Sequence, residues 1–124
     1  SCQRITDHDG LVLSIALSDD IENHQYLASG GSDYALNVYW ITNRGVIRCW
    51  NEKTAHSGAV LVMCFGHGDS AYLLFTGGQD AVVKVWNIQS GEVIGELLSH
   101  KERITAIATS PDGRYVVVSK LCDL

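Results

Sequence analysis

Short apolar stretches alternate with polar turns along the whole chain, and no stretch shows the period of an amphipathic helix. Four such stretches come first, four follow with similar spacing, and two more stand near the end. The pattern therefore predicts an all-β chain. The expected strands are 11–17, 25–29, 35–40, 46–50, 59–65, 72–76, 81–86, 93–97, 103–109 and 115–119.

Two stretches of the chain follow nearly the same pattern. Residues 28–33 read Ala-Ser-Gly-Gly-Ser-Asp, and residues 75–80 read Phe-Thr-Gly-Gly-Gln-Asp. An apolar strand with an aromatic residue near its end follows each of them. The two aspartates, Asp33 and Asp80, are 47 residues apart in the sequence. Self-similarity at such a period is typical of repeat architectures.

Sliding the same template along the chain finds a third, shorter copy. Each copy has a His, a hydroxyl residue and an Asp in this order, and the hydroxyl residue stands four positions before the Asp. The three sets are His8, Ser29 and Asp33; His56, Thr76 and Asp80; and His100, Ser119 and Asp123. Three copies in register indicate a repeated structural unit.

The second copy resembles a known family. Residues 78–87 read Gly-Gln-Asp-Ala-Val-Val-Lys-Val-Trp-Asn, which resembles the signature of the WD-repeat family with Asn87 in place of the usual Asp. The residue before His56 is Ala, and that before His100 is Ser, where the family has Gly. The first copy departs further, because Tyr39 stands at the position of the signature Trp. The resemblance implies four-stranded antiparallel blades of a β-propeller.

The resemblance also implies how the chain divides. We expect one blade at 11–50, a second at 59–97 and a half blade at 103–124. The resemblance also suggests that 1–6 hold the outer strand of a preceding blade. Family members usually close a ring of about seven blades, which two and a half blades cannot do. The expected fold is an incomplete WD-repeat β-propeller, a fragment or truncated form of a larger one. A small antiparallel sandwich or barrel is the alternative.

In the resembled family the recurring polar residues form a structural network. His56 would bridge Asp80 and Thr76, and the Trp86 indole N–H would close the set. A hydroxyl, imidazole and carboxylate could also form a nucleophilic triad, but an enzyme needs one site and this set recurs in each unit. We therefore predict no catalytic residue. The expected structural network comprises His56, Thr76, Asp80, Trp86, His8, Ser29, Asp33, His100, Ser119 and Asp123.

A second constellation of residues has metal-ligand character. Cys64 and His67 have a spacing that can hold zinc, and His56 offers a further imidazole. Alternation places Cys64 on a strand and His67 in the next turn, while His56 already belongs to the repeat. A small metal-binding or hydrolytic protein using these three residues is the alternative function. We expect no metal and no cofactor.

The family commonly serves as a rigid platform for protein or peptide recognition, on the face with the entrance to the central channel. That face would present the residues three and five after each His and the one before each Asp. These are Leu11, Leu13, Ser32, Ala59, Leu61, Gln79, Arg103, Thr105 and Cys122. The apolar ones favour a hydrophobic peptide or helix as partner. Alternatively, Leu13 and Leu61 only line the channel.

Composition excludes several classes of function. The net charge of -5 and the absence of a basic stripe argue against nucleic-acid binding. No apolar run is long enough to span a membrane. The four cysteines are irregularly spaced, unlike a disulfide framework, which favours an intracellular compartment. Open blade edges lead us to expect self-association as a hazard.

Overall fold

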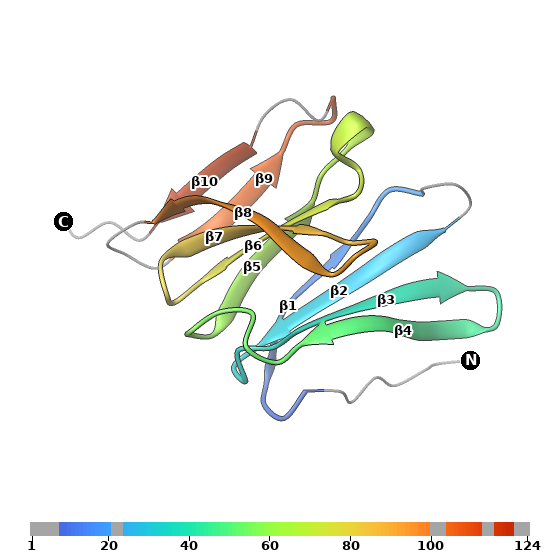
Figure 1. The fold of residues 1–124 in the computed structure, drawn as a ribbon, viewed down its shortest axis with the longest axis horizontal. Coiled ribbons are helices and arrows are strands. Elements are labelled where there is room, and N and C mark those ends of the chain that lie inside the picture. The colour runs from blue at the N-terminus through green and yellow to red at the C-terminus, as the bar shows by residue number, and fades with distance from the viewer. Residues whose placement is uncertain (1–7, 21–23, 100–103, 113–115, 121–124) are drawn as a thin grey trace.

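The computed structural model describes residues 8–20, 24–99, 104–112 and 116–120. Within these residues the chain forms strands joined by turns, together with one short 3₁₀ helix (Figure 1). The strands are β1 (Val12–Leu17), β2 (Gln25–Gly31), β3 (Leu36–Thr42), β4 (Gly45–Glu52), β5 (Val60–Phe65), β6 (Leu73–Gly78), β7 (Val82–Asn87), β8 (Glu92–Ser99), β9 (Ile104–Thr109) and β10 (Val116–Lys120), and the 3₁₀ helix η1 is Gly68–Ser70. The all-β expectation is confirmed.

The strands form antiparallel sheets in which each strand pairs with its neighbour in the sequence. β1–β4 make the first sheet, β5–β8 make the second, and β9 and β10 form a pair. Tight turns make this order possible: Gly45 begins β4 and Gly91 directly precedes β8, and their positive φ angles of 127° and 76° allow the equivalent turns. The expected four-stranded blades are therefore present. In the described part of the chain the sheets do not close a ring, as in an incomplete propeller.

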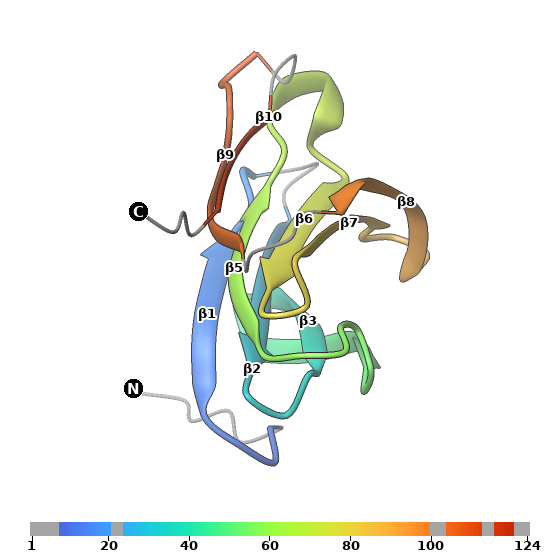
Figure 2. The ribbon, with the colours of Figure 1, turned by 90° about the vertical axis from the view of Figure 1, so that its left-hand side faces the viewer.

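The first strands of the three sheets lie next to one another. β1 contacts β5, and β5 contacts β9. Figure 2 shows these three strands following one another along one side of the molecule, with the later strands of each sheet extending away from them. The sheets thus succeed one another around a common side, as the repeat requires.

The core lies between the first and second sheets. Tyr26, Ala28 and Val38 of the first sheet are buried in one cluster with apolar residues of the second. The second sheet contributes Val60, Met63, Phe65, Leu74 and Trp86. Because neither sheet can bury both of its faces alone, this shared layer supplies much of the apolar burial of the chain.

Two glycines allow the sheets to approach each other closely. A methyl group on Gly30 would lie 2.5 Å from Cγ1 of Val60, and one on Gly77 would lie 2.9 Å from Cγ2 of Ile104. These glycines occupy equivalent positions in β2 and β6, which both run two residues past their expected ends. The extension arises because Gly31 and Gly78 still pair with β1 and β5.

Candidate functional site

The second sheet carries a closed polar network around a buried histidine. His56 precedes β5, and its Nδ1 lies 2.8 Å from Oδ2 of Asp80 while its Nε2 lies 2.7 Å from Oγ1 of Thr76. The indole Nε1 of Trp86 donates to the same Thr76 oxygen at 2.8 Å. An ionised carboxylate can only accept, so Nδ1 of His56 is the protonated nitrogen and donates to Asp80. In the neutral ring Nε2 is then an acceptor, and the Thr76 hydroxyl donates its proton to it.

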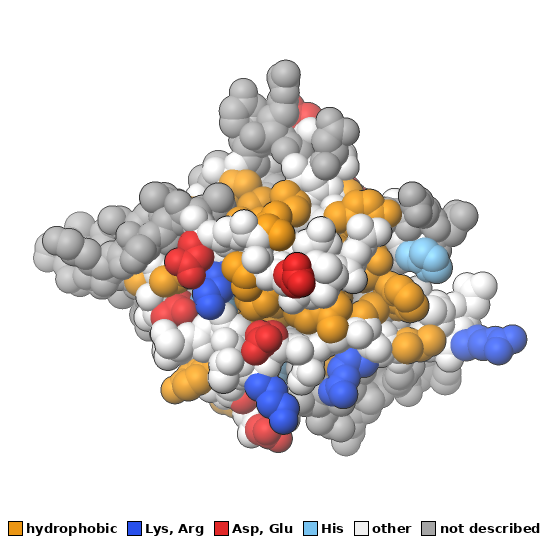
Figure 3. All heavy atoms as spheres, viewed as in Figure 1, with side chains coloured by type: hydrophobic (Ala, Val, Ile, Leu, Met, Phe, Trp, Pro, Cys, Tyr) orange, Lys and Arg blue, Asp and Glu red, His pale blue; other side chains and the backbone are white. Residues whose placement is uncertain are grey.

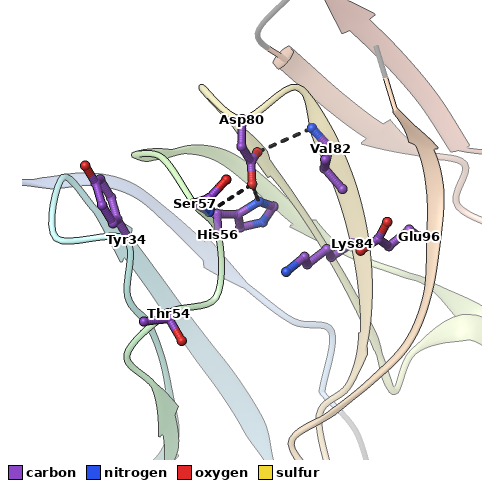
Figure 4. Close-up of a pocket in the computed structure, with 8 residues that line it drawn as sticks. All are labelled: Tyr34, Thr54, His56, Ser57, Asp80, Val82, Lys84 and Glu96. Carbon is purple, nitrogen blue, oxygen red and sulfur yellow. Dashed lines mark hydrogen bonds and ion pairs between the residues drawn. The ribbon is translucent and has the colours of Figure 1, made fainter. Parts of the chain in front are cut away.

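Asp80 also organises the turn between β6 and β7. Its Oδ2 accepts from the backbone N–H of Ser57 at 3.1 Å, and its Oδ1 accepts from that of Val82 at 3.3 Å. Ala81, which lies between Asp80 and Val82 in this turn, has a left-handed φ of 63°. That conformation is costly for a residue with a Cβ and persists only where surrounding contacts hold it. The dashed lines of Figure 4 show Asp80 joining the loop of His56 to the start of β7.

The first sheet carries the equivalent network with a different closure. Nδ1 of His8 lies 3.0 Å from both carboxylate oxygens of Asp33, and its Nε2 lies 2.8 Å from Oγ of Ser29. The side-chain amide of Asn37 contacts the same Nε2 at 3.1 Å. Tyr34 follows Asp33 with a φ of 69°, so the strained turn recurs as well.

Burial and hydrogen bonding shift the pKa of one group in each network. Burial lowers the pKa of His56 below its ordinary value, and Lys84 adds to the effect, although Asp80 opposes it. His56 is therefore neutral near pH 7. Burial alone would raise the pKa of Asp33, but the hydrogen bond from His8 and those from the backbone of Asp9 and Ala35 lower it overall.

The burial of the hydroxyls argues against nucleophilic catalysis. Each set has a hydroxyl, an imidazole and a carboxylate in line, as a triad requires. A nucleophile must reach its substrate, however, and Thr76 is 0% exposed while Ser29 is 7% exposed. The arrangement instead satisfies the polar groups that the turns bury.

Comparison with known proteins identifies the repeat. The family model described as "WD domain, G-beta repeat" matches residues 47–87 and 91–123, which together cover more than half of the chain. The chain belongs to the WD-repeat family. Members of this family are generally non-catalytic, and WD repeats generally mediate protein interactions.

Several relatives show how widely this repeat is used. The Lissencephaly-1 homolog of Caenorhabditis briggsae is 42% identical over 110 residues, covering 89% of this chain and 26% of that protein. Transducin beta-like protein 3 of Bos taurus is 30% identical over 77% of this chain and 12% of that protein. The guanine nucleotide-exchange factor SEC12 of Rattus norvegicus is 42% identical over 46% of this chain and 13% of that protein. The chain thus spans about a quarter or less of the length of each.

The WD repeats are offset from the sheets. The match over 47–87 begins within β4 and ends with β7, so it includes the outer strand of the first sheet and three strands of the second. The match over 91–123 begins just before β8 in the same way. Each WD repeat therefore spans two sheets.

The third copy of the His, hydroxyl and Asp pattern is described only in part. His100, Arg103, Cys122 and Asp123 lie outside the described residues, as do 1–6. Ser119 lies in β10, and nothing is described of its side chain. The expected third network thus stays a prediction.

The residues of the expected partner face differ in exposure. Leu11, Leu13, Ser32, Gln79 and Thr105 are exposed and Leu61 is half-buried. Ala59 is buried, because the loop before β5 is tied to the next turn: the side-chain oxygen of Gln79 accepts from the N–H of Ala59 at 3.3 Å, and the N–H of Gln79 donates to its carbonyl at 3.1 Å. Ala59 therefore offers almost no side-chain surface to a partner.

Nothing in the WD-repeat structure favours the metal-binding alternative. Both ring nitrogens of His56 have partners, and Nδ1 of His67 lies 2.8 Å from Oδ2 of Asp19. Burial raises the pKa of the Cys64 thiol, although a hydrogen bond with Thr109 partly opposes it, and zinc binds the thiolate. Among the described residues, no group of three or more His, Cys, Asp or Glu is placed to hold a metal ion.

Sequence reasoning missed two positions in each unit: the fourth residue after the Asp, and the turn residue that directly follows the Asp. Asn37 and Lys84 occupy the fourth position, and each adds a contact near its histidine: the amide of Asn37 reaches His8, and Nζ of Lys84 donates to the carbonyl of Ala55 at 2.7 Å. Their constant offset was a usable signal, but the two residue types differ. Nothing in Tyr34 or Ala81 signals a left-handed turn.

Proposed function

We propose that the chain is a non-catalytic WD-repeat scaffold for protein interactions and forms part of a larger propeller. One observation carries this proposal: the same His-Asp-hydroxyl geometry occurs in both sheets with its hydroxyls buried. We call each set a lock, because it holds a strand against a turn: His8, Ser29 and Asp33 form the lock of the first sheet, and His56, Thr76 and Asp80 that of the second. Since the locks are repeated and inaccessible, the rim and the channel side are left for partners. The repeated locks also support the network role for the corresponding residues of the third repeat.

We propose blades at 11–50 and 59–97, a half blade at 103–124 and a preceding outer strand within 1–6. The exposure of β1 supports the larger ring. Val12 is 49% exposed, whereas Val60, at the equivalent position of β5, is 0% exposed because the first sheet covers it. Ile15 is likewise exposed and its equivalent Met63 buried. A preceding blade would cover the first sheet in the same manner.

For the partner face we keep the exposed and half-buried residues of the expected set. Leu11 and Leu13 precede or begin β1, and Leu61 lies at the start of β5, so they are at the same end of neighbouring strands. An apolar segment of a protein partner suits this group. Arg103 stays part of the proposal as a charged position at the rim.

Charge and exposure bear on the other partners. On the face seen in Figure 3 the Lys and Arg side chains stand apart from one another among acidic ones, which supports the absence of a nucleic-acid partner. No helix in the part of the chain that the structure describes could cross a membrane.

The free thiols of Cys49 and Cys64 support an intracellular compartment. The exposed apolar residues of β1 support self-association of the isolated chain.

A substitution at His56 separates the scaffold from its metal-binding rival. His56→Gln should lower the free energy of unfolding in urea, because a neutral amide cannot bridge Asp80 and Thr76 in the same geometry. Neither the wild-type protein nor the His56→Gln variant should contain stoichiometric zinc by elemental analysis. His24→Gln, at an exposed histidine that stacks on Trp40, is the control and should change stability by less than about 0.5 kcal/mol. Stoichiometric zinc that disappears in the His56 variant would support the rival function.

Site-specific photo-crosslinking tests the partner face. A photoreactive amino acid at position 61 should form a discrete crosslinked species in cells, while one at Val93 should not. Val93 is an exposed apolar residue of β8, away from the proposed face. Crosslinks of equal yield from both positions would contradict the proposed face. Purifying the position-61 species identifies the partner directly.

A further inference from the structure

The first sheet touches the lock of the second sheet at two places. One is the turn between β2 and β3, where the carbonyl of Tyr34 accepts from the backbone N–H of His56 at 3.4 Å. Figure 4 shows Tyr34 beside the loop that carries His56 and Ser57, at a pocket of about 490 Å³ between the two sheets. The histidine of the second lock is therefore held from outside its own sheet.

The other place is the indole of Trp86, which donates to Thr76 of the lock at 2.8 Å. Trp50, on the outer strand β4 of the first sheet, stacks on this indole with ring centroids 5.9 Å apart. Its own Nε1 donates to the carbonyl of Ile88 at 2.8 Å. A methyl group on Gly91 would lie 3.1 Å from Cδ2 of Trp50, so the turn before β8 packs against the same ring. Trp50 thus covers Trp86 and fixes the chain that follows it.

The turn of Tyr34 depends on the lock of the first sheet. Tyr34 has a left-handed φ of 69°, and its N–H donates to the carbonyl of Gly31 at 3.3 Å. Oδ1 of Asp33, the carboxylate of the first lock, accepts from the N–H of Ala35 at 3.3 Å. A left-handed conformation in a residue with a Cβ persists only where surrounding contacts hold it. Asp33 therefore sets the direction of the carbonyl that receives the N–H of His56.

Burial separates the two locks in the direction that this support predicts. No sheet precedes the first one among the described residues, and Val12 of β1 is 49% exposed. The side chains of His8 and Asp33 are 4% and 13% exposed. Those of His56 and Asp80 are 0% and 7% exposed. The lock that has a sheet in front of it is thus the more deeply buried one.

We infer that the first sheet completes the lock of the second sheet. Asp33 and Trp50 are positioning residues of the second lock, although neither belongs to it. Asp33 holds the turn that receives the N–H of His56, and Trp50 holds the indole of Trp86 in place. Coupling of this kind travels through contacting side chains and hydrogen bonds. The inference goes beyond the proposed scaffold function and does not depend on where a partner binds.

Hydrogen exchange of two neighbouring amides tests the Tyr34 contact. The N–H of His56 donates across to the first sheet, whereas that of Ser57 donates to the carboxylate of the second lock. In the full chain, Asp33→Ala should accelerate exchange of the His56 amide about fivefold, the factor expected for one hydrogen bond, and that of the Ser57 amide much less. Asp20→Ala, at an exposed carboxylate, is the control and should change neither. Equal acceleration of both amides by Asp33→Ala, or none, would overturn the inference.

Two substitutions of Tyr34 separate its backbone from its ring. Tyr34→Asn removes the ring but tolerates the left-handed turn, so the His56 amide should keep its protection. Tyr34→Val also removes the ring, and its branched side chain opposes the turn, so it should accelerate exchange of that amide. If both variants accelerate it alike, the turn does not position His56 and the inference is overturned.

A double-mutant cycle in urea unfolding tests Trp50. Trp50→Phe should lower the urea midpoint of the wild-type chain. In Thr76→Val, where the indole of Trp86 has lost its acceptor, it should lower the midpoint only about half as far. In Ser29→Ala, which removes the corresponding hydroxyl of the first lock, it should have its full effect. The two replacements are matched, since each removes a hydroxyl and keeps the rest of the side chain's shape. Equal effects of Trp50→Phe in all three backgrounds would contradict its role in the second lock and overturn the inference.

Discussion

The first and second sheets each carry a lock of the same kind, and the two locks differ in the residue that completes the hydrogen-bond network. In the second sheet the indole of Trp86 completes the set through Thr76, and His56, Thr76 and Trp86 are all buried. In the first sheet Asn37 reaches the histidine instead, and its buried side-chain oxygen has no hydrogen-bond partner among the residues that the structure describes. Since an unsatisfied buried acceptor costs stability, the comparison teaches that fidelity to the repeat pattern measures how well a blade is locked.

The largest expected difference between the sheets concerns the two aspartates. Asp80→Ala should lower the free energy of unfolding by about 3 kcal/mol, because it leaves the N–H of a buried neutral histidine and two backbone N–H groups without their acceptor. Asp33→Ala should cost about 1.5 kcal/mol, since the carboxylate and histidine of the first lock are less buried. Urea unfolding measures both, with Asp20→Ala, at an exposed carboxylate, as the control. Equal losses would contradict the ranking of the two locks.

The next comparison concerns the two interfaces between successive sheets. Gly30→Ala should cost about 2 kcal/mol, since the new methyl group would press on Val60 and Met63. Gly77→Ala meets Ile104 at a slightly greater distance and should cost about 1 kcal/mol. Gly95→Ala, whose added methyl group would have no neighbour within 4 Å, is the control and should not destabilise.

Thermal unfolding of these three variants decides the point. A second substitution, Val60→Ala, should restore part of the loss in Gly30→Ala and none in Gly77→Ala. If all three alanine variants unfold alike, close approach of the sheets does not limit stability.

The two tryptophans outside the lock sharpen the comparison further. Nε1 of Trp50 donates to the carbonyl of Ile88 at 2.8 Å, and its ring stacks on Trp86 with centroids 5.9 Å apart. Trp50→Phe should therefore cost about 1 kcal/mol in urea unfolding. Trp40 is partly exposed and stacks on His24, so Trp40→Phe should change stability by less than about 0.5 kcal/mol. The reverse order would contradict the assignment of Trp50 to the core between the sheets.

The smallest expected effect is a difference in pH dependence. Unfolded His56 takes up a proton near pH 6.5, while the folded side chain stays neutral to lower pH. Its contribution is complete above this pH and is lost as the pH falls below it. His56→Gln should flatten the stability profile in this window. Asp33, with a folded pKa below 3.8, acts in a more acidic window, so Asp33→Asn should flatten only that part.

The sequence predicted the strands and the residues of the locks for one reason. The same order of His, Ser or Thr, and Asp recurs at nearly constant spacing. The pattern in one blade therefore supports the prediction made for the other. Asn37 and Lys84 escaped notice because the repeat holds their position constant while their residue types differ. The left-handed turns at Tyr34 and Ala81 could not be predicted, since neither residue favours that conformation and the neighbouring Asp imposes it. The burial of Ala59 depends on the side chain of Gln79, twenty residues away in sequence.

Hydrogen exchange of the tryptophan indole protons tests the lock most directly. The chain has three tryptophans, and nuclear magnetic resonance resolves their Nε1–H signals separately. We expect the Trp86 proton to exchange far more slowly than that of Trp40, and His56→Gln to accelerate it, because Thr76 loses the partner that orients it. A Trp86 proton that exchanges as fast as that of Trp40 would contradict the account.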